Sequence, residues 1–131
     1  MEYEPLPIIS QDYVKIVIPL IESAVNSIDI IVFEWRFYRT GLKNRVSQFN
    51  EAITRAVARG VRVRCLVRSQ GAINELKKMG CVARRLFTKR LLHNKLLIID
   101  KRRVVLGSHN FTQHAFSSNY ETSIFVTLKE A

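Results

Sequence analysis

Two glycines divide the first two thirds of the chain into alternating helical and extended segments. Gly60 and Gly80 each follow a segment with apolar residues at helical spacing, and each precedes a run of apolar and β-branched residues. Because glycine readily ends a helix in a left-handed conformation, we expect a helix before each glycine and a strand after it. The expected helices are 44–59 and 70–79, and the expected strands that follow them are 61–67 and 81–87.

The same pattern continues on both sides of this region. Residues 12–27 predict an amphipathic helix that starts late or kinks at Pro19. The remaining expected strands are 28–33, 93–100, 103–108 and 121–128, with a polar loop at 109–120 before the last one. Alternation followed by consecutive strands predicts an α/β fold for residues 1–131 as one domain: a mixed sheet flanked by helices in an α-β-α sandwich.

The chain is strongly basic, and its charge is unevenly distributed. The formal net charge is +10, and residues 35–103 contain 19 basic and 3 acidic side chains. Residues 76–99 contain seven basic side chains and no acidic one. This distribution favours a polyanionic partner, with nucleic acid first and an anionic membrane surface second. Of the nucleic acids, we expect DNA rather than RNA.

Cysteine content and hydropathy favour a cytoplasmic protein. The two cysteines, Cys65 and Cys81, are too few for a disulfide framework or a zinc site, so we expect both to be reduced and buried. The acidic start "MEYEPLP" is unlike a secretory leader, and we find no apolar run of the roughly 20 residues that a membrane span needs.

The stretch "LLHNKLLIID" places a histidine and a lysine in an otherwise apolar run. On a strand His93 and Lys95 share a face, whereas Asp100 lies at an odd separation and is expected to pair or cap locally at a turn. A neutral imidazole is a nucleophile or proton carrier, and an ammonium is a fixed positive charge, so together they suit a phosphoryl group. A half-exposed strand with incidental polar residues is the alternative interpretation.

Further polar groups follow the next strand. Gly107 allows a tight turn, and the hydroxyl of Ser108 and the amide of Asn110 can donate hydrogen bonds to phosphate oxygens. Glu121 stands at the start of the last expected strand, where its carboxylate can hold the second nitrogen of a catalytic histidine. Among the aromatic residues after strand 28–33, we expect Phe33 in the core and Trp35, Phe37 or Tyr38 near a groove.

These residues resemble the signature of the phospholipase D superfamily, the HKD motif. That signature is His-any-Lys, four residues, Asp, six residues, Gly-Ser, any residue and Asn. The matching residues, with the spacings intact, are His93, Lys95, Asp100, Gly107, Ser108 and Asn110. The segment "AITRAVARGVRVRCLV" is similar to the helix–strand unit that precedes the motif in this family, so the resemblance extends from about Ile28 onward.

The resemblance implies a mechanism without a metal or other cofactor. One histidine attacks phosphorus and forms a phosphohistidine, and a second histidine protonates the leaving oxygen and then activates water. By this resemblance His93 is the nucleophile or acid, Lys95 and Asn110 bind phosphate, and Ser108 supports that site.

The resemblance also assigns roles to the remaining motif residues. Glu121 orients His93, while Asp100 is more structural than chemical. His109 occupies the variable position of the motif, where it is expected to contact bound nucleic acid, and His114 is expected on a helix surface.

The chain carries one such motif, whereas the two-lobed members of the superfamily carry two. The small bacterial nucleases of the superfamily dimerise, so that each chain supplies one half-site, and we expect a homodimer here. The leading hypothesis is a metal-independent endonuclease acting on DNA or RNA. The alternatives are a phospholipase or phosphatidyltransferase, a nucleic-acid-binding module with a vestigial site, and the cleavage domain of a larger restriction or defence protein.

Overall fold

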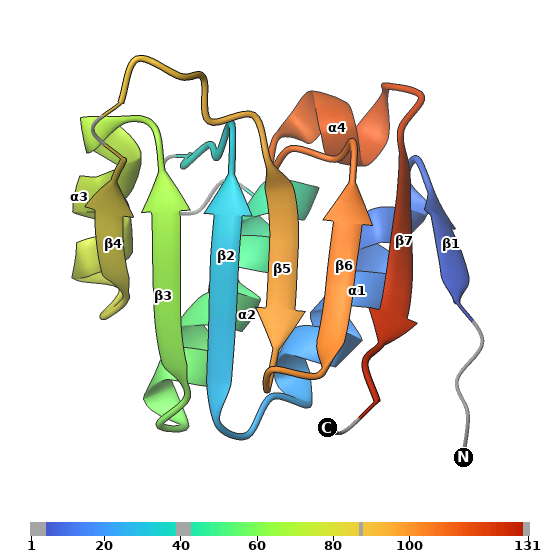
Figure 1. Cartoon of the computed structure of the whole chain (residues 1–131), viewed down its shortest axis with the longest axis horizontal. Helices are drawn as coiled ribbons and strands as arrows, with labels where there is room; N and C mark the ends of the chain where they lie inside the picture. Colours follow the sequence, from blue (N-terminus) through green and yellow to red (C-terminus); the bar gives the residue numbers. More distant parts are fainter. Residues whose placement is uncertain (1–4, 39–42, 87, 130–131) are drawn as a thin grey trace.

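A computed structural model describes residues 5–38, 43–86 and 88–129, which form a seven-stranded mixed sheet with four helices (Figure 1). The strands are β1 (Leu6–Ile9), β2 (Ser27–Val32), β3 (Arg62–Val67), β4 (Val82–Arg85), β5 (Lys95–Ile99), β6 (Arg103–Gly107) and β7 (Thr122–Thr127). The helices are α1 (Asp12–Glu22), α2 (Arg45–Ala58), α3 (Gln70–Lys78) and α4 (Gln113–Ser117). The strand order across the sheet is β1-β7-β6-β5-β2-β3-β4.

The sheet has a parallel part and an antiparallel part. Strands β2, β3 and β4 are parallel, and helices α2 and α3 make the crossovers between them. Strand β5 pairs antiparallel with β2, and β6, β7 and β1 continue the antiparallel pairing. The mixed sheet with flanking helices that the sequence predicts is therefore confirmed.

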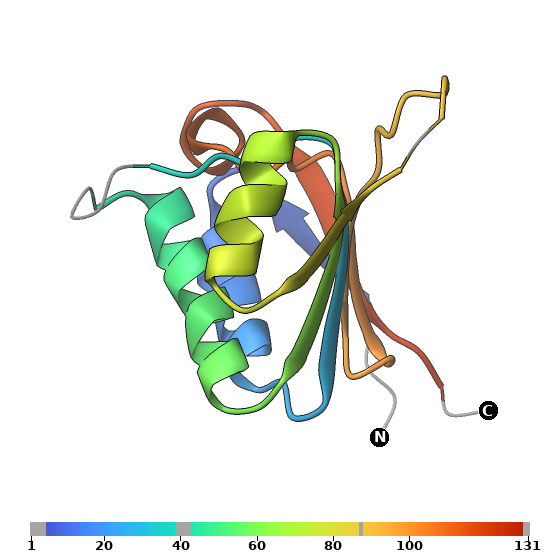
Figure 2. The same cartoon turned by 90° about the vertical axis from the view of Figure 1, so that its left-hand side faces the viewer.

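The helices pack against one face of the sheet (Figure 2). The residues of β2 that face the helices, Ile28, Ile30 and Val32, are almost fully buried, and each such side chain contributes roughly 1.5–3 kcal/mol to folding. Within the described ranges the opposite face carries no helix, so the second helix layer of an α-β-α sandwich is not among these residues.

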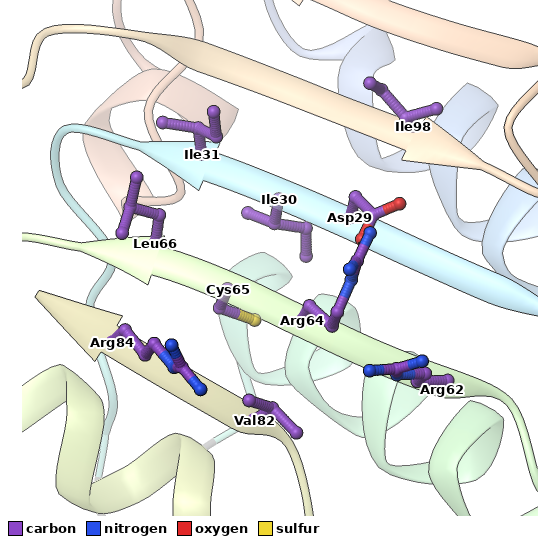
Figure 3. A pocket seen from close by; sticks show the side chains of 10 residues that line it. All are labelled: Asp29, Ile30, Ile31, Arg62, Arg64, Cys65, Leu66, Val82, Arg84 and Ile98. Carbon is purple, nitrogen blue, oxygen red and sulfur yellow. The ribbon is translucent and has the colours of Figure 1, made fainter. Parts of the chain in front are cut away.

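This open face of the sheet is basic (Figure 3). Arg62, Arg64 and Arg84 project from β3 and β4 among aliphatic side chains and line a hollow of about 540 Å³. Nε of Arg64 donates to Oδ1 of Asp29 on the neighbouring strand at 2.6 Å. The lining of this hollow does not include the motif histidine, His93.

The sequence did not predict two short elements of the structure. Strand β1 has only four residues, and Pro7 lies within it, which is tolerated because β1 is an edge strand. Helix α4 lies in the expected polar loop, and Thr112 caps its start by accepting a hydrogen bond from the amide of Ala115.

Element ends also differ from the expected ones. Helix α1 runs through Pro19 and ends at Glu22, which leaves Val25 exposed in the loop before β2. Strand β4 ends at Arg85, and Phe87, the last residue of the expected strand, lies outside the described residues. Both cysteines are buried and free, as expected.

Asp100 fastens the β5–β6 turn to the loop between α1 and β2. Its carboxylate accepts hydrogen bonds from the backbone amides of Val25, Asn26 and Ser27, at 2.7–3.2 Å, and from Arg103 at 3.1 Å. Partial burial opposes ionisation, but these backbone donors and the charge of Arg103 outweigh it and lower the pKa of Asp100. Asp100 is thus a local structural anchor at the edge of the sheet opposite to Lys95, the first residue of β5 (Figure 1).

Replacing Asp100 with asparagine tests this anchor, because asparagine keeps the size of the side chain and tolerates the positive φ of 53°. We expect Asp100→Asn to lower the free energy of unfolding by about 1–3 kcal/mol at neutral pH, since an amide N–H then faces backbone N–H groups. The folded-state pKa of Asp100 is depressed, so its stabilisation is present above the ordinary carboxyl pKa of about 3.9 and is lost as the pH falls below it. Urea unfolding should therefore show the largest difference near neutral pH and a shrinking one in acid.

Asp29→Asn is the matched control for this experiment. The Asp29 carboxylate pairs with an exposed arginine on the open face, so its loss should destabilise the protein much less. Equal losses for the two variants would show that Asp100 acts as an ordinary surface charge rather than as an anchor.

Candidate active site

The antiparallel pairing brings the motif residues to one edge of the sheet. Strand β5 starts at Lys95, Ser108 directly follows β6, and Glu121 directly precedes β7. Because these three strands alternate in direction, the start of β5, the end of β6 and the start of β7 lie at the same edge, at the top of Figure 1. The end of β2 reaches the same edge, where Val32 pairs with Lys95.

His93 and Lys95 form the centre of the site. Nζ of Lys95 lies 3.1 Å from Nδ1 and 3.3 Å from Nε2 of His93, and the histidine is exposed. An ammonium can only donate, so a hydrogen bond between the two needs an unprotonated ring nitrogen. Partial burial lowers the pKa of Lys95, and the negative charge of Glu121 opposes this effect.

Phe33 packs against the catalytic candidates rather than in the core. Its ring meets the imidazole of His93 edge-on, with centroids 4.7 Å apart, and Nζ of Lys95 lies 5.5 Å from its centroid. Trp35, by contrast, is 6% exposed, and its indole N–H donates to Asn50. The expected assignment of these two aromatic residues is therefore wrong: Trp35 is the core residue, and Phe33 borders the site.

Asn110 is held at the end of β2, next to the other half of the motif. Its Oδ1 accepts a hydrogen bond from the amide of Glu34 at 3.1 Å, which leaves its Nδ2 group as a donor for a ligand. Phe33, which precedes Glu34, donates a hydrogen bond from its amide to the carbonyl of Asn94 at 2.8 Å. The end of β2 thus connects the segment that carries His93 with the segment that carries Asn110.

The carboxylate of Glu121 contacts Ser108 and Asn119. It accepts hydrogen bonds from the hydroxyl of Ser108 at 2.6 Å and from Nδ2 of Asn119 at 3.0 Å. The Ser108 hydroxyl in turn accepts from the amide of Thr122 at 2.9 Å. In this arrangement Glu121 orients Ser108 and favours the charged form of Lys95, while its expected hold on His93 stays a prediction.

Gly107 is required by close contact between strands. A Cβ atom at this position would lie 2.3 Å from Cα of Ser123 on β7, which no side chain can occupy. Any larger residue would push β6 away from β7 and displace Ser108 from Glu121. This explains the Gly-Ser pair in the motif by packing.

His109 is a buried structural residue, so the expectation that it contacts substrate is wrong. It is 0% exposed, and both ring nitrogens are used: Nε2 donates to the carbonyl of Ser10 at 2.8 Å, and Nδ1 lies 2.7 Å from the hydroxyl of Ser123. The ring of Tyr13 packs against it at 4.6 Å, and burial lowers the pKa of His109. Burial could be anticipated only from the fold, because the sequence shows a polar residue in a polar loop.

His114 lies on α4, where it is exposed and bonded to Ser118. A hollow of about 550 Å³ beside Asn110 also includes His114, Tyr38 and Asn119, none of which the sequence placed in a common site. Among the residues that the structure describes, no three His, Cys, Asp or Glu side chains gather as metal ligands would.

The arrangement suits attack on a phosphoryl group. An imidazole stands at an exposed edge, an ammonium lies in contact with it, and the amide donor of Asn110 follows on the next segment. Fixed donors of this kind stabilise the charge that develops on phosphate oxygens during transfer.

Comparisons with known proteins agree with a fold of the phospholipase D-like kind. Residues 17–131 match the family model described as "Cardiolipin synthase, PLD-like domain". A curated phospholipase D from Rickettsia conorii is 34% identical over 85 residues, which is 60% of this chain and 42% of that protein, so the chain spans less than half of its relative's length.

Two solved structures share the fold. NucT from Helicobacter pylori superimposes with a TM-score of 0.78 at 21% identity, over 96% of this chain and 86% of that chain. Nuc from Salmonella typhimurium, a phospholipase D family member, gives a TM-score of 0.78 at 23% identity, over 95% and 84% of the two chains.

Glu121→Gln tests how the carboxylate acts. The amide can still accept from Ser108, so we expect the fold to persist while turnover of a phosphodiester falls about 10- to 100-fold. Burial lowers the pKa of Lys95, and the negative charge of Glu121 raises it. Without that charge the pKa of Lys95 falls further, so the alkaline limb of the pH–rate profile moves to lower pH. Glu75→Gln is the control, because it removes a surface carboxylate paired with Lys78 on α3. It should leave the turnover rate and the pH–rate profile unchanged. An unshifted profile in Glu121→Gln would reassign this residue to a purely structural pair.

Proposed function

The chain belongs to the phospholipase D-like domain family, and we propose that it is a metal-independent phosphodiesterase that cleaves nucleic acid, DNA in preference to RNA. The observation that carries this proposal is the contact between His93 and Lys95 at the exposed edge of a sheet. His93 is the proposed nucleophile, and Lys95 and Asn110 are the proposed phosphate-binding groups. Ser108, whose hydroxyl donates to Glu121, is proposed to support that site.

The proposed reaction has two steps. A ring nitrogen of His93 attacks phosphorus, the bond from phosphorus to the leaving oxygen breaks, and a second histidine gives that oxygen a proton. The same second histidine then takes a proton from water, the water oxygen attacks phosphorus, and the phosphorus–nitrogen bond breaks to free His93. Lys95 remains protonated throughout and stabilises the charge on the non-bridging oxygens.

The distribution of charge supports nucleic acid as the substrate. Arg68 and Arg85 stand at the same edge as His93, at the ends of β3 and β4, so several cations border the site. Such a surface binds a polymer of phosphates through counterion release. The second candidate is a phospholipid, which the name of the Rickettsia relative favours. Among the described residues, no helix has the length and apolar character to cross a membrane.

The need for a second histidine supports a homodimer. The chain has three histidines, and both ring nitrogens of His109 are engaged inside the fold. His114 belongs to α4 and bonds to Ser118. We therefore propose that two copies meet about a two-fold axis and that His93 of the second copy supplies the acid and base.

His93→Ala should abolish turnover while leaving nucleic-acid binding intact, because the basic surface provides affinity and His93 provides the chemistry. Purified protein is incubated with DNA, RNA and phospholipid vesicles in excess EDTA, and product formation and binding are measured. The parent protein should cleave DNA under these conditions. A rate for His93→Ala within about tenfold of the parent, roughly 1.4 kcal/mol in barrier, excludes nucleophilic catalysis by this residue. His114→Ala is the matched control and should remain active.

A mixed dimer tests the shared site. A wild-type chain and a His93→Ala chain carry different affinity tags, so that the mixed dimer can be purified. This dimer should have one motif histidine in its site and should not catalyse multiple turnover. Sedimentation should show the parent as a dimer at assay concentration. Half of the parent's activity in the mixed dimer, or full activity of a monomer, would mean that each chain holds a complete site, with His114 as the first residue to test for the missing role.

A further inference from the structure

A basic hollow lies next to the candidate active site, between the ends of β3 and β4 and the connection that leads to β5. Its volume is about 360 Å³, and its polar lining residues are Arg68, Arg85, Thr88 and Arg90. The connection that borders it continues through Leu91 and Leu92 directly into His93. In Figure 1 this connection rises above the top edge of the sheet from β4 to β5.

Phe33 joins this hollow to the catalytic candidates. Cζ of Arg68 lies 4.1 Å above the centroid of the Phe33 ring, and Nζ of Lys95 lies 5.5 Å from the same centroid, so the two cations are within about 9.6 Å of each other. Successive phosphates of one strand advance about 3.4 Å along a B-form axis, so cations this close together can contact neighbouring phosphates of one bound strand. A cation–π contact uses none of the N–H donors of Arg68, which can therefore bind phosphate oxygens.

The opposite side of the site has a different charge. The hollow beside Asn110 includes Glu34 and Arg36, which form an ion pair at 2.7 Å and cancel each other's charge. Its other polar groups are neutral amides and hydroxyls, together with His114. Positive charge therefore lies on the Arg68 side of His93, and a chain of phosphates should continue in that direction.

We propose that the hollow of Arg68 and Arg90 is a subsite for a phosphate that flanks the scissile one in a polynucleotide. The proposal rests on the proposed phosphodiesterase function, and it narrows the substrate to a polymer, because a phospholipid with one phosphodiester leaves the subsite empty. Arg68 binds this phosphate while stacked on Phe33, so the ring that borders His93 also sets the distance between the two phosphate sites.

The experiment compares Arg68→Gln and Arg90→Gln with Arg84→Gln. Arg84 is exposed on the open face (Figure 3). Its substitution removes the same charge as the two test variants, so it controls for the loss of one positive charge from the protein surface. Binding of a single-stranded DNA oligonucleotide is measured by anisotropy against salt concentration with His93→Ala in the background. Turnover is measured on the same oligonucleotide and on bis(p-nitrophenyl) phosphate, which has one phosphate and no neighbour.

We expect each of the two test variants to reduce the slope of log affinity against log salt by about 0.7, the value for one phosphate contact on a single strand. KM for the oligonucleotide should rise about tenfold more than KM for bis(p-nitrophenyl) phosphate. Arg84→Gln should change neither the slope nor the ratio between the two substrates.

Equal changes in the slope for Arg84→Gln and Arg68→Gln would overturn the subsite and indicate a diffuse basic surface. Equal losses on both substrates would overturn it too, because Arg68 would then act on the scissile phosphate or on Phe33. Failure of the proposed function has a separate signature: the parent protein turns over neither substrate. The binding experiment still decides the subsite in that case, since it does not depend on turnover.

Discussion

The candidate site depends on the antiparallel pairing of β5 with β6. The turn that joins them has two residues with positive φ, Asp100 and Lys101, and the Asp100 carboxylate accepts hydrogen bonds from three backbone amides at the start of β2. With the turn fixed, the register of the two strands places Leu96 opposite Leu106. The start of β5 and the residues after β6 therefore meet at the far edge, a full strand length from the anchor.

This geometry separates the motif into a structural end and a chemical end. The apolar residues between Lys95 and Asp100 lie in the centre of the sheet and, together with their pairing partners, fix the direction in which Lys95 projects. Burial that helps the fold also disfavours the charge on Lys95, and Glu121 offsets this through its negative charge. Burial and the phosphate-binding role proposed for Lys95 therefore make opposite demands on its charge, and the hydrogen bonds from Ser108 and Asn119 hold the Glu121 carboxylate in place.

The surface around the site is as uneven as the charge along the chain. The strand ends that carry Arg68 and Arg85 lie on one side of His93, and the side beside Asn110 contains a neutralised ion pair. Beyond them, the sheet has an open face in the described part of the chain, on which arginines stand among aliphatic residues. An extended anion should bind in a preferred direction on such a surface. The cation–π contact with Phe33 fixes the position of Arg68, the first cation on that side.

The sequence by itself determined the mixed sheet, most element positions, and the residues of the motif, because helical and strand periodicities and glycine stops are local signals. It also assigned Asp100 to a turn away from His93 and Lys95, although in the structure the length of β5, Lys95–Ile99, separates them rather than the alternation of side chains. Only the tertiary structure decided which polar or aromatic residues are buried. His109 became a core residue because Ser10 and Ser123 are brought to its two nitrogens from 99 and 14 residues away. Phe33 and Trp35 exchanged their expected places, and Glu121 contacts Ser108, because those contacts join segments that are separated in the sequence and leave no periodic trace in it.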